Sequence, residues 1–389
     1  MPAAPSIGEV RALLDVSAVP ARPVGAGVYT IELARGLGAR PDIDLHLAAR
    51  RDDAARWSEI APEATVHALV PRRRPGRLAW EQTAAPALAR RSGADLWHGP
   101  HYTMPLALNS PAVVTFHDLT WFDHPEWHER AKVPFFRSLI RRSAARANVA
   151  ICVSEETARR LRAVTATPAE IVVAHHGVDP SRFRPDADLD EDLALLAAHG
   201  VTPPFVASHP GTIEPRKDVP TLVAAFARVA ATRPDLRLVI AGADGWGTPA
   251  ARDAITASGV ASRVLRPGYL PTAVLPALLR RAEVVAYPSL YEGFGLPAVE
   301  ALACGAPLVT TSGSALEEVV GLAALVVPPA DPAALAHALE AVLADATVAR
   351  RLRAEGPARA ATFTWAASID RHVEAYERAV DRHRQACPA

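Results

Sequence analysis

The chain has 389 residues, half of them apolar, which exceeds one ordinary domain of about 100 to 200 residues and leads us to expect two domains. Its 42 acidic and 42 basic residues balance, which excludes the strong positive field of a dedicated nucleic-acid-binding protein. The N-terminus has no basic start followed by an apolar core, and no apolar run approaches about 20 residues, so we expect a cytoplasmic protein. The three cysteines, Cys152, Cys304 and Cys387, lack metal-ligand spacing, and Cys304 is expected in the core.

Short apolar runs alternate with helical patterns along the chain. In the first half, strands are expected at 10–19, 112–119 and 149–154, and helices at 29–37, 135–147 and 155–163. In the second half, strands are expected at 205–211, 236–242, 262–270, 283–289 and 306–311, and helices at 219–231 and 296–305. Strands and helices that alternate at this spacing predict an α/β protein whose parallel sheets carry helices on both faces.

The stretch 177–204 is rich in Asp and Pro and has no strand pattern, so we place the domain boundary there, with domains at 1–195 and 196–365. The final stretch has apolar residues at spacings of three and four, which predicts one long amphipathic helix over 366–386. These apolar positions are Trp365, Ile369, Val373, Tyr376 and Val380.

Ligands of open α/β sheets bind beyond the carboxyl ends of the strands, so the loops from strand to helix are the first places to look for chemistry. The loop 20–29 carries Gly25 and Gly27 just before a helix, where close backbone approach and free amides suit an anion. A dinucleotide-binding loop would need a third glycine in a tighter turn, and Thr30 stands at that place. A nicotinamide site is therefore disfavoured.

The loop 209–220 follows the first strand of the second domain and leads into a helix. Gly211 and Thr212 allow close backbone approach, and Arg216 with Lys217 places two cations just before the helix. Lys217 is one of only two lysines in the chain. A planar guanidinium beside a mobile ammonium suits a diphosphate, and the alternative is a solvated basic turn that pairs with neighbouring acids.

A third loop places Glu292 before a Gly-Phe-Gly turn and Glu300 in the first turn or so of the helix that follows. Amides of the turn and the helix start would hold an anionic diphosphate between these two carboxylates. The carboxylates would then accept hydrogen bonds from hydroxyl groups at either end of the ligand, which is the pattern of a nucleotide sugar. The turn adds four candidate donor-binding residues: Gly293, Phe294, Gly295 and Leu296.

Several of these motifs occur together and in order along nearly the whole chain: GAGVYT, VVTFHDLTWFDHPEWH, ICVSEETARRL, GTIEPRKD and the E-x7-E of Glu292 and Glu300. Together they resemble family four of the retaining glycosyltransferases, and HGPHYTMPL before VVTFHDL is similar to its mannosyltransferase-like branch. The resemblance implies the GT-B fold, in which two Rossmann-like doubly wound parallel-sheet domains face each other across a cleft. It also implies that the terminal helix crosses back to the first domain after Trp365.

The resemblance implies roles for individual residues of the donor side. Arg216 and Lys217 would hold the diphosphate, Glu300 the ribose, and Glu292 the hydroxyls of the transferred sugar. The loop beside the base would contain Gly268, Tyr269 and Leu270.

On the acceptor side the resemblance implies that His117, at the end of the strand 112–119, points toward the transferred sugar. A histidine at a strand end can also be a structural hydrogen-bonding residue, and both interpretations stay open here. Val28 departs from the family, which often has a basic residue after the second glycine, and this puts an acceptor-phosphate contact there in doubt.

The resemblance implies an enzyme that moves a hexose, with mannose favoured, from a GDP-mannose-like or UDP-sugar donor to an acceptor hydroxyl. The acceptor would be a saccharide, a lipid-linked glycan or a small metabolite. Retention would need no metal and no other cofactor, because Arg216, Lys217 and turn amides stabilise the leaving diphosphate. A nucleotide-sugar epimerase of the same architecture and a non-catalytic nucleotide-sugar sensor are the alternatives.

Other polar patterns are interpreted without a ligand. The D-x-D pairs at 42–44 and 188–190 lie in polar turns. His98 and His101, with His175 and His176, are candidate metal ligands, but Pro100 breaks any helix that would align His98 with His101. The segment 129–147 mixes arginines with aromatic and aliphatic residues, so it could lie on an anionic membrane at the inner face, although core packing is favoured. The arginines at 72–74 and 77 add weight to an anionic surface or acceptor.

Overall fold

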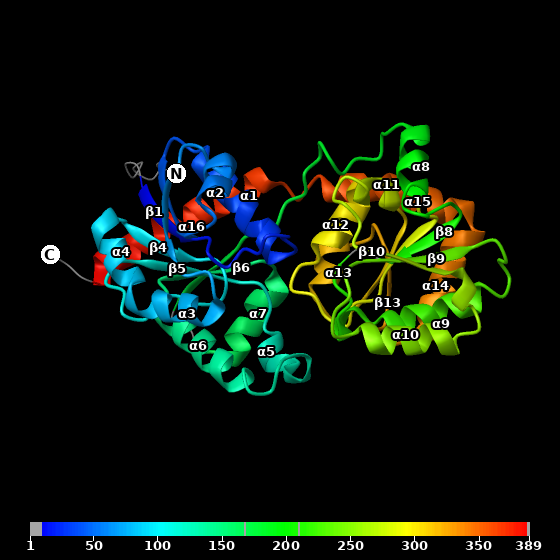
Figure 1. Cartoon of the computed structure of the whole chain (residues 1–389), viewed down its shortest axis with the longest axis horizontal. Coiled ribbons are helices and arrows are strands. Elements are labelled where there is room, and N and C mark those ends of the chain that lie inside the picture. Colours follow the sequence, from blue (N-terminus) through cyan, green and yellow to red (C-terminus); the bar gives the residue numbers. More distant parts are fainter. Residues whose placement is uncertain (1–9, 167–168, 209–210, 387–389) are drawn as a thin grey trace. The chain divides into compact units, whose positions relative to one another are not determined.

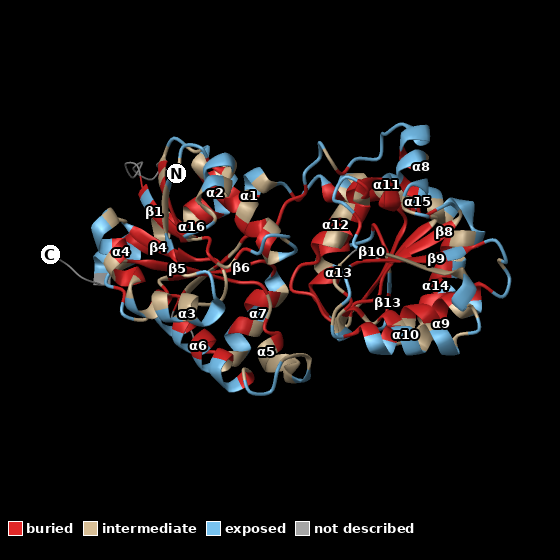
Figure 2. Ribbon diagram, viewed as in Figure 1, coloured by how far each residue is buried: buried red, intermediate tan, exposed pale blue. Residues whose placement is uncertain are grey.

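The computed structural model describes residues 10–166, 169–208 and 211–386, so Cys387 lies outside the described residues. The chain divides into two compact units (Figure 1). The first unit contains 1–176 together with 365–389, and the second contains 177–364. Each unit has a central parallel sheet whose inner strands are buried between helices (Figure 2).

The first unit is built around a seven-stranded parallel sheet in the order β3-β2-β1-β4-β5-β6-β7. Its strands are β1 (Val10–Asp15), β2 (Ile43–Arg50), β3 (Thr65–Val70), β4 (Leu96–Gly99), β5 (Ala112–Phe116), β6 (Val149–Cys152) and β7 (Glu170–Val173). The strands β4, β5 and β6 are buried along their whole length, as expected for central strands that are covered on both faces.

Two hydrophobic clusters lie on opposite faces of this sheet, because successive residues of a strand point to opposite sides. Leu14 and Leu47 enter one cluster, and Leu13 and Ala48 enter the other. The first cluster is covered by α1 (Ala26–Gly38), α2 (Ala54–Ile60) and α16 (Trp365–Ala386). The second is covered by α3 (Arg74–Thr83), α4 (Ala85–Ser92), α6 (Val133–Arg146) and α7 (Glu155–Val164), and the short α5 spans Thr120–Asp123.

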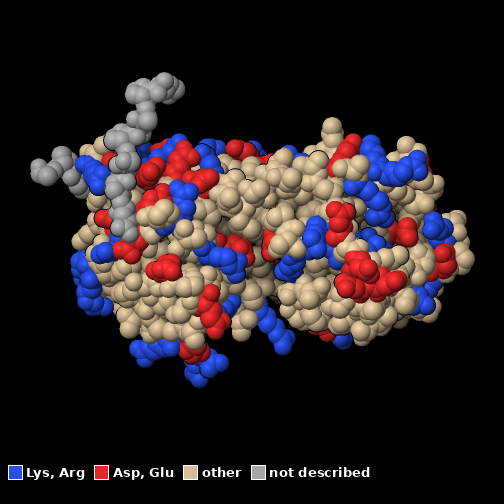
Figure 3. Space-filling model, turned by 90° about the horizontal axis from the view of Figure 1, so that it is seen from above, with Lys and Arg blue, Asp and Glu red and all other residues tan. Residues whose placement is uncertain are grey.

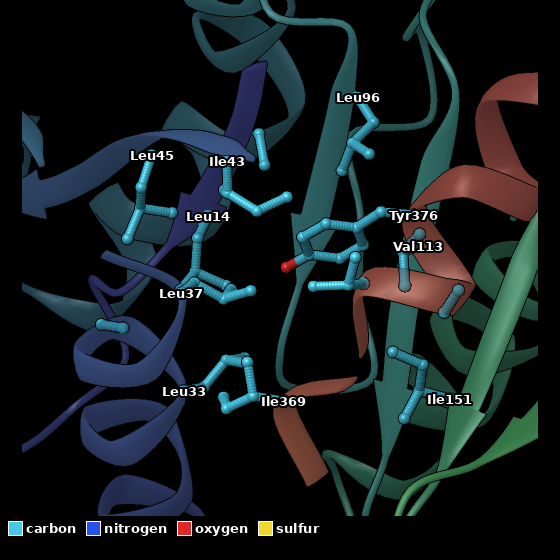
Figure 4. Close-up of a cluster of buried hydrophobic side chains, with 14 of the residues drawn as sticks. Leu14, Leu33, Leu37, Ile43, Leu45, Leu96, Val113, Ile151, Ile369 and Tyr376 are labelled. Carbon is cyan, nitrogen blue, oxygen red and sulfur yellow. The ribbon is translucent and has the colours of Figure 1, made fainter. Parts of the chain in front are cut away.

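The terminal helix α16 packs into the first unit. Ile369 and Tyr376 lie in the core among Leu33 and Leu37 of α1 and residues of the sheet, as Figure 4 shows. Trp365 packs at the edge of the same cluster. The spacing of apolar residues in the sequence therefore predicted the buried stripe correctly, and the C-terminal helix does cross back to the first unit.

A buried hydrogen-bond network fixes α16 to the sheet. The Tyr29 hydroxyl lies 2.8 Å from both Thr115 Oγ1 and His372 Nε2. His98 bridges Thr115 Oγ1 at 2.8 Å and the Tyr376 hydroxyl at 2.7 Å. Burial lowers the pKa of His98 well below its usual value and that of His372 to about 4, so both rings are neutral and serve as structural hydrogen-bonding groups.

The second unit has a six-stranded parallel sheet in the order β10-β9-β8-β11-β12-β13. Its strands are β8 (Phe205–Ser208), β9 (Arg237–Ala241), β10 (Val264–Gly268), β11 (Val284–Tyr287), β12 (Leu308–Thr311) and β13 (Leu325–Val327). Helices α9 (Val219–Val229), α10 (Thr248–Ala257) and α14 (Pro332–Ala344) lie on one face. Helices α11 (Leu275–Arg281), α12 (Leu296–Ala303) and α13 (Ala315–Val320) lie on the other, and α15 (Ala346–Ala360) packs against α12 and α14.

The division between the units falls at residue 177, earlier than the predicted boundary at 195. The stretch 177–204, in which the sequence predicts the domain boundary, contains the helix α8 (Leu189–Ala197), which packs on α11 of the second unit. Asp192 of α8 is buried and accepts hydrogen bonds from Arg280 at 2.7 Å and Arg281 at 2.7 Å. This buried ion pair ties the stretch to the second unit, which sequence composition did not indicate.

Acidic and basic side chains are interspersed on the face of the molecule that Figure 3 shows. No single helix of the described residues is long and apolar enough to cross a membrane, although the bent pair Pro332–Ala344 and Ala346–Gln385 passes the same test together. In α6, Phe136, Leu139 and Ile140 are buried, which confirms core packing, whereas the neighbouring Phe135 is 50% exposed.

Candidate active site

The sheet of the second unit has its topological switch point between β8 and β11. The chain runs from β8 outward through β9 to β10 and then returns to β11, which pairs with the other side of β8. Ligands of such sheets bind beyond the carboxyl ends of the strands at this point. The two loops that begin here are the ones in which the sequence predicts diphosphate-binding residues.

The loop after β8 brings two cations to this edge. Pro215–Lys217 form a short 3₁₀ turn, and Asp218 then caps α9 by accepting the Thr221 amide at 3.4 Å. Gly211, Thr212 and Lys217 line one cavity, whereas the first two residues of the loop 209–220 lie outside the described residues. The Leu290 amide donates to the Arg216 carbonyl at 2.8 Å, which joins this loop to the one after β11.

Arg216 and Lys217 both face Glu292. The Lys217 ammonium donates to Glu292 Oε1 at 2.6 Å, and the Arg216 guanidinium forms an ion pair with Glu292 Oε2. Lys217 and Glu292 are each 8% exposed. The structure therefore places three of the predicted catalytic residues in one cluster, in which Lys217 and Glu292 are buried, Arg216 is partly buried, and the carboxylate of Glu292 compensates two positive charges.

The cluster sets the protonation states of its members. Burial alone would raise the pKa of Glu292, but the charges of Arg216 and Lys217 outweigh burial and hold this pKa well below its usual range. For Lys217, burial and the neighbouring Arg216 lower the pKa to about 8, although Glu292 opposes this. The site thus holds an ionised carboxylate and an ammonium that loses its proton easily.

The loop after β11 ends in α12, with Gly295 as the residue before the helix. Gly295 has a φ of 97°, and a Cβ there would come within 2.5 Å of the Leu316 side chain, so only glycine fits. Phe294 is buried and packs edge-on against Phe363, with ring centroids 5.6 Å apart. Gly293 and Leu296 are buried in the same turn.

Glu300 lies in the second turn of α12, slightly further along than the sequence suggested. Its side chain is partly exposed, and no hydrogen bond or ion pair to its carboxylate forms within the described part of the chain. Burial raises its pKa to about 7, and the charge of Arg182 only partly offsets this. Cys304, at the end of the same helix, is buried in the core as predicted.

The predicted base-side loop begins at the end of β10. Gly268 has a φ of 75°, and its carbonyl accepts the Gly242 amide of the neighbouring loop at 2.8 Å. Tyr269 is 46% exposed, whereas Leu270 is buried. The loop lies at the carboxyl edge of the sheet, two strands away from β8.

The remaining candidates belong to the first unit. Gly25 has a φ of 48° and precedes α1, and Gly27 lies in the first turn of this helix. His117 follows β5, is buried, and its Nε2 lies 2.8 Å from the Pro100 carbonyl oxygen. Burial lowers the pKa of His117, although that carbonyl and Asp118 oppose the shift. His117 thus makes the kind of hydrogen bond that is expected of a structural histidine at a strand end.

Family models and a known relative match most of the chain. The family model described as Glycosyltransferase Family 4 matches residues 23–182, and the one described as Glycosyl transferases group 1 matches residues 198–359. O-antigen chain mannosyltransferase B of Escherichia coli is 32% identical over 284 residues, which cover 72% of this chain and 74% of that protein. The chain is a member of glycosyltransferase family 4.

Further comparisons agree with this assignment to glycosyltransferase family 4. D-inositol 3-phosphate glycosyltransferase of Jonesia denitrificans is 29% identical, over 91% of each chain. Sucrose-phosphate synthase of Thermosynechococcus elongatus superposes with a TM-score of 0.78 at 24% identity, over 95% of this chain and 98% of that one. HepE of Anabaena in complex with UDP-glucose superposes with a TM-score of 0.75 at 20% identity, over 94% of this chain and 99% of that one. The fold of the family 4 glycosyltransferase is GT-B, as the sequence resemblance implied.

Sequence reasoning missed two residues of the cluster around Glu292 in this glycosyltransferase. The Ser289 hydroxyl donates to Glu292 Oε1 at 2.8 Å, and Lys217 lies 3.3 Å from the Tyr287 hydroxyl. Both residues stand at or just after the end of β11. Their position three and five residues before Glu292, at the carboxyl end of a strand, was the available signal.

Three aspartates of the two D-x-D pairs have partners within the protein. Asp42 forms an ion pair with Arg40 at 2.7 Å and Asp44 with Arg11 at 2.5 Å, whereas Asp188 caps α8. No group of three or more His, Cys, Asp or Glu residues is arranged for a metal ion within 10–166, 169–208 and 211–386.

Proposed function

We propose that this family 4 glycosyltransferase transfers a mannose-like hexose from a nucleoside-diphosphate sugar to an acceptor hydroxyl, with retention of configuration and without a metal ion. The observation that carries the proposal is the pair of cations, the partly buried Arg216 and the buried Lys217, beside the switch point of the second unit. The name of the Escherichia coli relative supports mannose, and the Anabaena complex supports a nucleoside-diphosphate sugar.

In the proposed reaction, the bond between the anomeric carbon and the diphosphate oxygen breaks while the acceptor oxygen bonds to the same face of that carbon. The acceptor proton passes to the departing phosphate oxygen. Arg216 and Lys217 stabilise the charge that builds on the diphosphate. Glu292 keeps both cations at the site and accepts sugar hydroxyls, Glu300 accepts the ribose hydroxyls, and His117 contacts the transferred sugar.

The proposal is tested by a donor panel and by product analysis. GDP-mannose and UDP-glucose are compared side by side by thermal shift, and nucleoside diphosphate is then assayed with and without a saccharide acceptor. Nucleoside diphosphate that forms only with acceptor, together with the glycosylated acceptor, supports transfer. An epimerised donor with no transfer would favour the epimerase, and donor binding without turnover on any acceptor would favour a sensor.

Glu300→Gln is expected to weaken donor binding about tenfold at pH 7.5 and to leave the turnover number nearly unchanged, because a hydrogen bond to a charged group contributes about 1.5–3 kcal/mol. The pKa of Glu300 is raised to about 7, so its carboxylate becomes ionised as the pH rises from 6 to 7.5. Donor affinity of the wild type should increase over this range, and that of the variant should stay flat. Donor dissociation constants measured by calorimetry check this, with the exposed Glu340→Gln as the control.

We also propose a peripheral contact between α6 and an anionic membrane. Phe135 is half exposed, and Arg141 and Arg142 are exposed on the same helix. An exposed aromatic ring beside basic residues suits the headgroup region of such a bilayer. Phe135→Ser should reduce co-sedimentation with phosphatidylglycerol vesicles severalfold at low salt, whereas equal binding of variant and wild type would contradict the proposal.

A further inference from the structure

The donor turn, residues 293–295, packs on the segment where the chain leaves the second unit. This Gly-Phe-Gly turn is where the proposed function places the diphosphate. Phe294 at its centre is 3% exposed, and its ring meets the ring of Phe363 edge-on, with centroids 5.6 Å apart. Phe363 is also buried, and the second unit ends one residue later, at Thr364. The donor turn is therefore seated on the exit segment of its own unit.

Phe294 carries the only side chain of the donor turn, because Gly293 and Gly295 have none. Glycine loses more backbone freedom on ordering than any other residue, so a turn of this composition gains much of its rigidity from outside contacts. Turn amides stabilise a developing negative charge well only when they are held in place beforehand. The ring of Phe363 supplies such a contact from a distant part of the chain.

Arg359 ties the same exit segment to α13, the helix that supports Glu292. Its guanidinium lies over the Phe363 ring, 4.9 Å from the centroid, and its Nε donates to the Val319 carbonyl at 2.8 Å. Val319 lies near the end of α13, and the first residue of this helix, Ala315, donates its amide to the Glu292 carbonyl at 3.2 Å. The exit segment thus supports the site through two separate contacts, one to the donor turn and one to α13.

The chain passes between the units twice, after residues 176 and 364, and these two crossovers are adjacent. In the second unit, the Val178 amide donates to the Phe363 carbonyl at 3.1 Å. In the first unit, the rings of His176 and Trp365 lie 5.8 Å apart. Phe363 is thus the residue at which the support of the donor turn meets the two crossovers.

We propose that Phe363 and Arg359 are positioning residues that hold the donor turn for the diphosphate and couple donor binding to the conformation of the two crossovers. The inference rests on the proposed transferase function. A diphosphate bound to the turn amides fixes the Phe294 ring, and the contact of this ring with Phe363 then stabilises the hydrogen bond to Val178. The coupling is reciprocal, so a change that loosens the crossovers weakens donor binding by the same factor.

A second pair of the same kind in this unit provides a matched control. Arg263 lies over the Phe226 ring, 5.8 Å from the centroid, and donates to two backbone carbonyls at 2.8 Å. Phe226 belongs to α9 and lies in the core of the second unit. The pair reproduces the chemistry of Phe363 and Arg359 in a part of the core to which the proposal gives no role.

Phe363→Leu should weaken the binding of the donor about three- to tenfold, since an aromatic pair contributes about that much. Calorimetry measures the dissociation constants of GDP-mannose and UDP-glucose separately. Phe294→Leu should have a similar effect, and the double variant should bind no more weakly than either single variant, because both changes remove one contact. Phe226→Leu should bind donor like the wild type, although thermal unfolding should show a comparable loss of stability.

Hydrogen exchange of the Val178 amide tests the coupling, because this amide donates to the Phe363 carbonyl. Saturating donor should slow its exchange about threefold or more in the wild type and in Phe226→Leu. In Phe363→Leu, saturating donor should leave the exchange rate unchanged. A phenylalanine that only fills the core would not produce this difference between the two variants.

The inference is wrong if bound donor does not slow Val178 exchange in the wild type, or slows it equally in Phe363→Leu. If Phe363→Leu does not fold, Arg359→Gln takes its place, with Arg263→Gln as its control. Donor-dependent protection that Phe363→Leu abolishes, without transfer to any acceptor, contradicts the proposed function alone. Transfer by a wild type whose crossovers do not respond to donor contradicts the coupling alone, and failure to bind either donor contradicts both.

Discussion

Lys217→Ala is expected to lower the turnover number by about a hundred- to a thousandfold, which is the usual loss when one stabilising donor is removed from a preorganised site. The ammonium of Lys217 lies in the buried cluster at the switch point, where the charge of the leaving diphosphate would develop. This charge grows as the bond to the sugar breaks, so turnover should fall more than donor KM rises. Steady-state release of nucleoside diphosphate in the presence of acceptor measures both quantities.

The folding stability of Lys217→Ala should change much less than its activity. Arg216 remains paired with Glu292, so the variant avoids the about 3–5 kcal/mol that an unpaired buried charge costs. Thermal unfolding provides this comparison. Lys132→Ala removes the only other lysine, which is partly exposed and paired with Glu129, and serves as the matched control with wild-type turnover. Near-wild-type turnover of Lys217→Ala would overturn the proposed function.

Glu292→Gln is expected to lower turnover by about a hundredfold and the free energy of unfolding by about 3–5 kcal/mol. The substitution leaves Glu214, which forms an ion pair with Arg216 at 3.5 Å, as the remaining carboxylate beside Arg216 and Lys217. Burial and Arg216 already lower the pKa of Lys217 to about 8, and loss of the carboxylate should lower it further. More of the Lys217 side chain is then neutral at pH 8, where the wild type still keeps about half of its charge.

The pH dependence of Glu292→Gln separates two roles for this carboxylate. If Glu292 acts mainly by keeping Lys217 charged, the ratio of variant to wild-type turnover should rise as the pH falls from 8 to 6, because the ammonium regains its proton. If Glu292 acts only on sugar hydroxyls, the ratio should stay constant over this range. Turnover numbers at saturating donor, measured at several pH values, decide between the two, and thermal midpoints identify the range in which the variant is folded.

Much of the fold could be predicted because buried parallel strands are short continuous apolar runs, as in β5, β6 and β11. The strands β2, β3, β4, β7 and β13 were not predicted. In β2, the polar residues Asp44 and His46 interrupt the apolar run, and β13 has only three residues. A strand of that length is recognised by its pairing with a neighbour, which a local pattern does not contain.

The sequence predicted which residues form the candidate site but not which of them contact each other. The sequence places cations before one helix and a carboxylate before another, yet Lys217 and Glu292 are 75 residues apart, and they meet because β8 and β11 are neighbours. In the first unit, the arginines at 72–74 form the exposed basic run that the sequence suggested. Arg77 instead donates a hydrogen bond to the Ser17 carbonyl, and Glu81, one turn later on α3, is buried. A sequence pattern treats both charged residues as surface residues.

The position of α16 has a consequence for the order in which the protein can be assembled during synthesis. The core around Leu33 and Leu37 includes Ile369 and Tyr376, which are translated after the entire second unit. Domains generally fold as units as they emerge from the ribosome, so the second unit is the first whose sequence is complete. The N-terminal unit begins synthesis first but finishes folding last, and a chain that stops at residue 364 would lack part of this core while keeping every strand of both sheets.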